Sequence, residues 1–237
     1  MKPVLIPDPF LEKHLDKPAL TLILDGEPDV DFLLKELTRE LGGRAGFVQA
    51  ALDPARICQR MALEDMGFRL ADATIHFEGV PRFAVPPRVD ARLARAEDEA
   101  LVREMAANSL TLNRFSQDPG VPEEKARAIK ADWAGNYFAG ERGDALYLAL
   151  LDGVPKGFLL LLRRPGAVVV DLIAVEAEAR GQGLGTALAA AAMEGEPGGR
   201  PLSAGTSAAN AAAMAFYQSL GLRAVELTYH HHLHGAF

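Results

Sequence analysis

A short glycine-rich segment behind an apolar run places the strongest constraint on this chain. Residues 167–175 read AVVVDLIAV, a run of β-branched and aliphatic residues that is typical of a buried strand. The segment ARGQGLGTALAAAAM (179–193) follows, with Gly181, Gly183 and Gly185 directly before alanines that favour a helix. A strand, a glycine loop and a helix in this order predict an α/β unit whose helix N-terminus can receive an anion.

Two well-known phosphate-binding patterns do not fit this loop. A P-loop needs a Lys followed by Ser or Thr, and no Lys follows here. A dinucleotide fingerprint that begins at Gly181 has Thr186 in its last glycine position, and one that begins at Gly183 has Leu188 there. Residues 180–185, RGQGLG, instead fit the pattern Gln/Arg-x-x-Gly-x-Gly/Ala.

Other elements follow from periodicity and turn signals. Asn210 is placed to cap a helix, and Gly221 is placed to end it. Asp152-Gly153 between two apolar runs predicts a β-hairpin. The expected helices are 98–109, 123–138 and 211–220, with another that opens after the glycine loop, and further strands are expected over 167–175, 200–207 and 223–233.

The proline-rich segment around Pro86-Pro87 predicts a linker, which divides the chain into domains 1–85 and 86–237. The first domain carries an echo of the second, because MALEDMGFRLADATIH (61–76) aligns with AFYQSLGLRAVELTYH (215–230). Helix–Gly–strand is a common pattern, so both chance similarity and a decayed internal copy remain open at this stage.

Composition narrows the class of partner. A net charge of −7 argues against general binding to nucleic acid or to anionic membranes. Cys58 is the sole cysteine, so no internal disulfide can form. The N-terminus lacks a signal-peptide pattern, and no apolar run approaches the length of a membrane span. We therefore expect a cytoplasmic protein.

Two motifs in order carry a family resemblance. DLIAVEAEARGQGLGTAL resembles the acetyl-CoA-binding motif of the GNAT N-acetyltransferases, and Asn210 with AAMAFYQSLGL resembles the family's next motif, N-x-x-A-x-x-x-Y-x-x-x-G-F/L. The resemblance covers about residues 90–237. It implies an α/β protein with a mixed sheet and a GNAT acyltransferase fold, here with a smaller N-terminal domain that is a partial, degenerate GNAT-like half.

The resemblance implies acetyl-CoA as the acyl-donor cosubstrate. The strand before the loop would pair with the pantetheine arm, and the N–H of Ile173 would face the thioester oxygen. The residues expected to bind the donor are Ile173, Ala174, Val175, Arg180, Gly181, Gln182, Gly183, Leu184, Gly185, Thr186 and Asn210.

Tyr217 stands where the family places its general acid. A phenol pKa of about 10 against about 8.5 for a thiol makes full proton transfer uphill by roughly 2 kcal/mol, so a hydrogen bond to the developing thiolate is the easier role. Asp171 shares strand parity with Ile173 and is a candidate general base, with a hydrogen-bonded structural carboxylate as the alternative.

Residues 109–138 occupy the acceptor-binding region of the family. They resemble a subgroup typified by TDP-fucosamine acetyltransferase, in which Arg114 would meet a diphosphate and Phe115 or Trp133 would stack on a base or sugar. A small amine, an amino acid or a protein N-terminus is the alternative acceptor. A non-catalytic acetyl-CoA sensor is the alternative function. We expect a small-molecule amine partner, no nucleic-acid or membrane partner, and leave a homodimer open.

The segment YHHHLH (229–234) holds four of the six histidines. Strand alternation places His230, His232 and His234 on one face, and Tyr229, His231 and Leu233 on the other. Histidines two apart on a strand can bind zinc, but the sequence shows no third ligand, so we expect no metal site.

Overall fold

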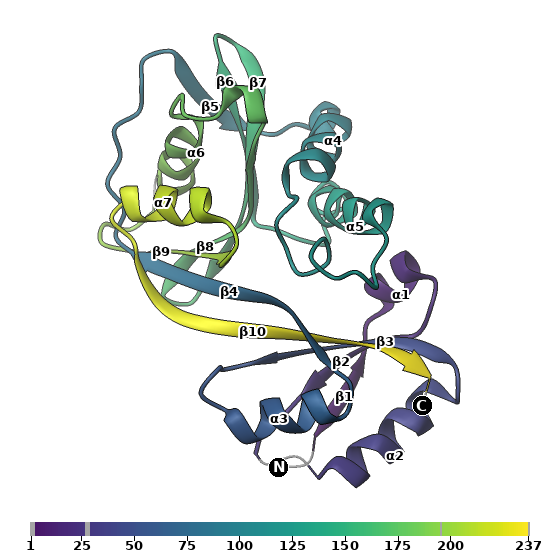
Figure 1. Cartoon of the computed structure of the whole chain (residues 1–237). Coiled ribbons are helices and arrows are strands. Elements are labelled where there is room, and N and C mark those ends of the chain that lie inside the picture. The colour runs from purple at the N-terminus through teal and green to yellow at the C-terminus, as the bar shows by residue number, and fades with distance from the viewer. Residues whose placement is uncertain (1–2, 27–28, 195, 237) are drawn as a thin grey trace.

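The computed structural model describes residues 3–26, 29–194 and 196–236. Within these residues the strands form one ten-stranded mixed sheet, in the order β1-β2-β3-β10-β4-β9-β8-β7-β6-β5 (Figure 1). The strands are β1 (Val4–Pro7), β2 (Ala19–Ile23), β3 (Ala45–Leu52), β4 (Arg69–Gly79), β5 (Val89–Leu93), β6 (Ala145–Leu151), β7 (Val154–Arg164), β8 (Ala167–Val175), β9 (Leu202–Ser207) and β10 (Arg223–Ala236). The helices are α1 (Pro9–Leu15), α2 (Val30–Leu41), α3 (Ile57–Asp65), α4 (Glu99–Ser109), α5 (Glu123–Gly135), α6 (Leu184–Met193) and α7 (Ala211–Ser219), with short 3₁₀ turns at Ala96–Asp98 and Ala177–Ala179. The α/β mixed-sheet class expected from the sequence is confirmed.

The middle of the sheet is built by an exchange of strands between the two halves of the chain. β4 ends the N-terminal half and pairs with β9 of the C-terminal half. β10 ends the C-terminal half and pairs with β3 of the N-terminal half. β4 and β10 also pair with each other, so one continuous sheet contains strands from both sides of the expected linker around residue 86 (Figure 1).

The two halves repeat the same run of elements. α2 and α6 begin at Val30 and Leu184, and α3 and α7 begin at Ile57 and Ala211, in both cases 154 residues apart. Each half also joins two parallel strands through a helix, β2 to β3 and β8 to β9. The echo seen in the sequence is therefore one part of a longer structural repeat.

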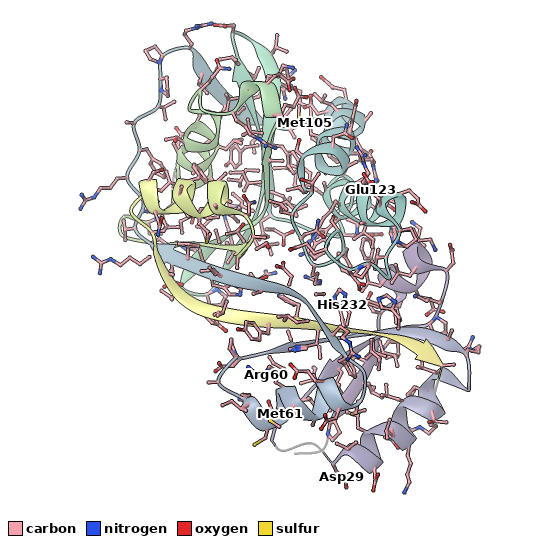
Figure 2. All side chains as sticks on the ribbon, in the orientation of Figure 1. Asp29, Arg60, Met61, Met105, Glu123 and His232 are labelled. Carbon is pink, nitrogen blue, oxygen red and sulfur yellow. The ribbon has the colours of Figure 1, made fainter. Side chains whose placement is uncertain are left out.

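Helices cover both faces of each half of the sheet. Side chains of α6 and α7 pack on one face of β6–β9, and those of α4 and α5 pack on the other. In the N-terminal half, α2 and α3 cover one face, and α1 joins α5 on the other. Buried side chains fill the space between these layers (Figure 2).

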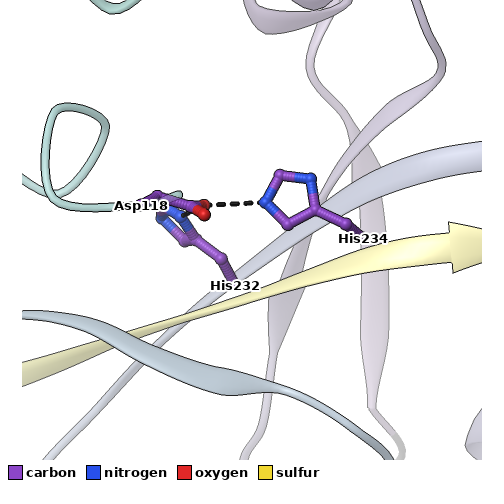
Figure 3. Close-up of side chains that lie close together, drawn as sticks. All are labelled: Asp118, His232 and His234. Atoms are coloured by element: carbon purple, nitrogen blue, oxygen red, sulfur yellow. Dashed lines mark hydrogen bonds and ion pairs between the residues drawn. The ribbon is translucent and has the colours of Figure 1, made fainter. Parts of the chain in front are cut away.

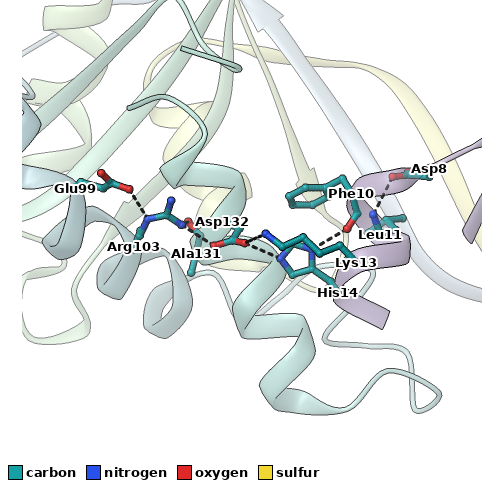
Figure 4. A network of polar contacts seen from close by, with 9 residues as sticks. All are labelled: Asp8, Phe10, Leu11, Lys13, His14, Glu99, Arg103, Ala131 and Asp132. Carbon is teal, nitrogen blue, oxygen red and sulfur yellow. Dashed lines mark hydrogen bonds and ion pairs between the residues drawn. The ribbon is translucent and has the colours of Figure 1, made fainter. Parts of the chain in front are cut away.

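Polar contacts also tie α1 to α5 (Figure 4). The carboxylate of Asp132 on α5 accepts hydrogen bonds from Lys13 at 3.1 Å, from His14 at 3.0 Å and from Arg103 at 2.6 Å. Lys13 and His14 belong to the N-terminal half, whereas Arg103 lies on α4. Asp132 therefore links α1 of the N-terminal half to α4 and α5 of the C-terminal half.

Most local predictions hold. Asn210 Oδ1 accepts the backbone N–H of Ala213 at 3.1 Å and caps α7, and Gly221 takes a left-handed φ of 86° behind it. The hairpin turn at Asp152-Gly153 forms between β6 and β7. The helix expected over 123–138 ends earlier, at Gly135. No helix among the described residues is long and apolar enough to cross a membrane.

Candidate active site

Two neighbouring parallel strands separate and open a cleft in the sheet. β8 pairs with β9 only from Val168 to Val170, so the second half of β8 has no strand on its β9 side. On its other edge β8 stays paired with β7 up to Val175. The opening is therefore bordered by one free strand edge on each side.

The pairing with β7 fixes which backbone groups face this opening. The N–H of Glu176 donates to the carbonyl of Lys156 at 2.9 Å, which marks that antiparallel pair as hydrogen-bonded. Hydrogen-bonded and non-hydrogen-bonded pairs alternate along such a ladder. Ile173 and Val175 therefore point their N–H and C=O groups away from β7 and into the opening.

The glycine loop joins β8 to α6 at the top of the opening. Gly181 and Gly183 have φ values of 76° and 89°, which other residues rarely adopt. Gly183 also allows a close approach, because a Cβ there would lie 2.6 Å from the ring of Pro86. Gly185 is inside the helix, where a Cβ would lie 3.0 Å from the ring of Phe216. The loop thus leaves the first N–H groups of α6 unobstructed.

A cavity of about 600 Å³ fills the space between this loop, β8 and α7. Eleven of the residues expected at the donor and catalytic site line it, namely Ile173, Ala174, Val175, Arg180, Gly181, Gly183, Leu184, Gly185, Thr186, Asn210 and Tyr217. Gln182 does not line it, and its amide is instead near the carbonyl of Glu178 at 3.5 Å. Arg180 folds back and donates from Nε to the carbonyl of Val175 at 3.1 Å.

Tyr217 lies at the inner wall of the cavity and is only 2% exposed. Its ring contacts Phe77 and Phe216, with centroid separations of 5.6 and 5.2 Å. Burial raises the pKa of Tyr217 above its ordinary value, so the hydroxyl keeps its proton at neutral pH. Tyr217 is thus a core side chain that also lines the cavity.

Asp171 differs from its expected surroundings. The β7–β8 ladder has a bulge, in which Leu160 pairs with Leu172 and Leu161 with Val170, so Asp171 has no cross-strand partner. The bulge breaks the strand alternation, and Asp171 faces α5 while Ile173 packs against the α6–α7 side. The expectation that both residues face the same side is wrong.

The carboxylate of Asp171 is fully engaged. Arg142 donates from Nε to Oδ2 and from Nη2 to Oδ1, each at 2.6 Å, and Trp133 Nε1 donates to Oδ2 at 3.2 Å. These contacts favour the structural alternative for Asp171 over a general base. Sequence reasoning missed Arg142, because it lies in an irregular loop with no motif around it.

On the α5 side of the sheet, two cationic side chains have no ion-pair partner among the described residues. Arg114 Nε is buried without a hydrogen-bond partner, and burial lowers the pKa of Arg114 to about 10. Lys130 is 8% exposed, and its Nζ lies 4.4 Å from the ring centre of Trp133. Burial and the neighbouring Arg114 lower the pKa of Lys130 to about 7. In the described part of the chain, neither side chain forms an ion pair.

The other two expected acceptor residues have different surroundings. Phe115 is fully buried and packs with α1 and α5 in the core, so it cannot stack on an acceptor as expected. Trp133 is half-buried, with Lys130 and Arg142 each 4.4 Å from its ring centre. Lys130 carries no sequence signal, because a single Lys on an amphipathic helix is usually solvated.

The alternation expected for the C-terminal histidines is present in β10. His232 and His234 face the loop after α4, where both contact Asp118, whereas Leu233 packs in the core with α2 and α3. Burial, with smaller contributions from Arg114 and His232, lowers the pKa of His230 to about 3. His230 is therefore neutral at any physiological pH.

Comparison with known proteins agrees with this geometry. Residues 109–222 match the model of the acetyltransferase (GNAT) family. These residues, a little under half of the chain, are therefore similar to a GNAT acetyltransferase domain, and the fold is the GNAT fold. Spore coat polysaccharide biosynthesis protein SpsD of Bacillus subtilis (strain 168) is 28% identical over 151 residues, which make up 62% of this chain. The chain spans about half of that relative, 52% of its length.

Two solved structures share the overall fold. A GCN5-related N-acetyltransferase from Sphaerobacter thermophilus aligns with a TM-score of 0.64 and 14% identity, over 98% of this chain and 76% of that one. A tandem GNAT protein from the clavulanic acid biosynthesis pathway aligns with a TM-score of 0.60 and 16% identity, over 92% and 75% of the two chains. The second likeness agrees with the repeated halves of this sheet.

Proposed function

We propose that the protein transfers an acetyl group from acetyl-CoA to a primary amine, by direct attack of the amine on the thioester. The observation that carries this proposal is the opening between β8 and β9, where Ile173 and the N–H of Val175 have no β9 partner beside a helix N-terminus. The cavity is lined by the strand edge, by the glycine loop and by Tyr217. Its lining suits a long donor with an anionic end and a reactive thioester end.

Each end of the donor has a physical reason for its place. The first N–H groups of α6 are unpaired within the helix, and the helix dipole adds partial positive charge, so a pyrophosphate is favoured there. The free edge at Ile173 and Val175 can pair with the amide groups of a pantetheine arm. The side-chain oxygen of Asn210 is used by the helix cap, which leaves its amide N–H groups for the ligand.

The reaction then needs two contributions from the chain, one to the oxyanion and one to the leaving thiolate. A neutral amine attacks the thioester carbon, the new C–N bond forms, and the C–S bond breaks. The N–H of Ile173 stabilises the oxyanion, and the hydroxyl of Tyr217 donates a hydrogen bond to the leaving thiolate. The raised pKa of Tyr217 fits this donor role better than full proton release, so the proton that the thiolate finally takes comes from the acylated ammonium.

The acceptor that the α5 side favours carries a negative charge besides its amine. Burying a cation without an ion pair is costly, and neither Lys130, which is buried, nor Arg114, which is half-buried with its Nε enclosed, forms an ion pair among the described residues. A phosphate or diphosphate would supply both with a partner, which supports a nucleotide-activated amino sugar. The polysaccharide-related name of SpsD agrees with a sugar acceptor. A small cationic amine or a protein N-terminus would leave both cations unpaired.

Release of free CoA thiol with a panel of amines tests the proposal. We expect thiol release with amino sugars linked to a nucleoside diphosphate, and much less with the same amino sugars lacking phosphate. Release with small amines or peptides alone would move the acceptor class to those compounds. Tight acetyl-CoA binding with no amine-dependent release would instead support a non-catalytic sensor.

A further inference from the structure

Three side chains with metal-binding chemistry meet where β10 passes the loop between α4 and α5 (Figure 3). The Oδ2 atom of Asp118 lies 2.6 Å from Nδ1 of His232 and 2.7 Å from Nε2 of His234. One ligand atom from each residue lies within 4.8 Å of the other two. Asp118 lies 114 residues before His232, so the fold supplies the third ligand that the sequence did not show.

The loop around Asp118 is shaped for this contact. Asp118 Oδ1 accepts the backbone N–H of Gly120 at 2.8 Å, which turns Oδ2 toward the two histidines. Gly120 is needed for the approach, because a Cβ there would lie 2.6–2.8 Å from the ring atoms of His234. Nothing larger than glycine leaves the imidazole in its place.

The cluster is enclosed on all sides except one. The side chains of His232 and Asp118 are 1% and 7% exposed, whereas that of His234 is 26% exposed. The ring of His232 packs against Phe47 and Phe115, with centroid separations of 4.8 and 5.8 Å. Its Nε2 is buried without a partner. A ligand would therefore enter past His234.

We propose that Asp118, His232 and His234 form a binding site for a divalent transition-metal ion, with Zn²⁺ as the ion that this donor set favours. Two imidazole nitrogens and one carboxylate oxygen are common zinc ligands, and a water molecule can complete a tetrahedron. Bonds of about 2.0–2.2 Å hold tetrahedral ligands roughly 3.3 Å apart. The present contacts to Asp118 need to open by less than about 1 Å to reach that separation.

An imidazole that binds a metal ion through one ring nitrogen carries its proton on the other ring nitrogen. In His234 this other nitrogen, Nδ1, lies 3.0 Å from Nζ of Lys17. An ammonium cannot accept that N–H, so Lys17 must turn toward solvent when the ion binds. Lys17 therefore opposes metal binding.

A bound ion would join β10, the last strand in the chain, to the loop that carries Arg114. Both ends of this link lie outside the acetyl-CoA cavity, so the proposal is independent of acetyl transfer. Its measurable consequence is greater stability, because the ion binds the folded chain and not the unfolded one.

Calorimetric titration of Zn²⁺ into chelator-treated full-length protein tests the site. We expect one equivalent to bind, and Tm to rise by about 5 °C at a hundredfold excess over Kd. Co²⁺ used in place of Zn²⁺ should give the visible absorption bands of a tetrahedral site. Lys17→Gln should bind Zn²⁺ more tightly, because an amide oxygen can accept the Nδ1 proton of His234.

Matched variants separate a metal site from a hydrogen-bonded cluster. Asp118→Asn keeps an acceptor for the histidines but loses the charge, and His234→Gln removes a half-exposed ligand. Each should weaken Zn²⁺ binding by more than about tenfold while circular dichroism shows a folded chain. His14→Gln is the control, since His14 makes a similar contact to Asp132 without a second histidine. Absence of binding to the native protein, or unchanged binding in Asp118→Asn and His234→Gln, would overturn the proposal.

Discussion

Arg142 donates two hydrogen bonds of 2.6 Å to the carboxylate of Asp171. Asp171 is the residue at which β8 forms a bulge in its ladder with β7. The pair lies next to the stretch of β8 that separates from β9 and forms the wall of the cavity. Asp171 therefore fixes the shape of the strand that lines the cavity, and both of its carboxylate oxygens are occupied by hydrogen bonds.

This relationship predicts that Asp171 and Arg142 act as one unit. Asp171→Asn and Arg142→Met should each lower the free energy of unfolding by about 1–3 kcal/mol, because each leaves a half-buried partner unpaired. The double variant should lose no more than the worse single variant, which urea unfolding measures directly. Both variants should mainly raise KM for acetyl-CoA. A loss of kcat by a factor of a hundred or more in Asp171→Asn alone would restore Asp171 as a general base.

Tyr217→Phe tests the hydroxyl at the cavity wall. The ring stays in place against Phe77 and Phe216, so the fold and the KM for acetyl-CoA should change little. Loss of the hydrogen bond to the thiolate should reduce kcat by about a hundredfold. Tyr229→Phe, on a strand away from the cavity, is the matched control and should leave kcat unchanged. Equal kcat in both variants would leave Tyr217 with a packing role only.

Gly181 and Gly166 offer a matched pair for the donor loop. Both have left-handed φ values, 76° and 89°, and a Cβ at either meets no atom within 4 Å. Ala at either position should cost about 1–2 kcal/mol of stability for backbone reasons alone. Only Gly181 lines the cavity. Calorimetry should therefore show an affinity for CoA at least tenfold weaker in Gly181→Ala and an unchanged affinity in Gly166→Ala. Equal affinities would place the pyrophosphate elsewhere.

The lowered pKa of Lys130 predicts a pH-dependent acceptor affinity. An anion beside Lys130 favours its charged form, so binding takes up a proton wherever free Lys130 is neutral, above pH of about 7. Affinity for a phosphate-bearing acceptor should therefore fall as pH rises through about 7. The charged groups around Lys130 are Arg114, Arg142, Asp171 and Asp72.

Lys130→Met is the control for this pH dependence. The variant should bind the acceptor more weakly at pH 6 and show a flat affinity from pH 6 to 9. Stability gives a second reading, because a folded pKa below the unfolded one makes the native protein more stable as pH rises from about 7 toward 10. The variant should lack that rise. A native affinity that does not change with pH would remove Lys130 from the acceptor site.

The donor side of the site could be read from the sequence, because backbone and helix-terminus chemistry leaves a local signature. The glycine pattern before α6 and the Asn210 cap are short-range features, and both keep their place in the structure. The strand exchange could not be foreseen in this way. It depends on β4 and β10 leaving their own halves, and the repeated pattern is the same with or without that exchange.

The acceptor side was harder to predict for a related reason. Phe115 and Lys130 reverse the usual expectation, with the aromatic ring in the core and the lysine buried against the ring of Trp133. The bulge at Asp171 turns its side chain to the opposite face, and strand periodicity alone carries no sign of it. Asp118 joins His232 and His234 through a contact between segments far apart in the chain, which no spacing rule contains.

Amine-dependent acetylation measured by mass spectrometry is the direct test of the proposed acetyl transfer from acetyl-CoA to an amine. The native protein is mixed with acetyl-CoA and an amino sugar carried on a nucleoside diphosphate, and both products are quantified. We expect N-acetylated sugar and free CoA thiol in equal amounts, and we expect both to be strongly reduced in Tyr217→Phe. Binding of acetyl-CoA in the β8–α6–α7 cavity without acetylation of any amine in the panel would contradict it.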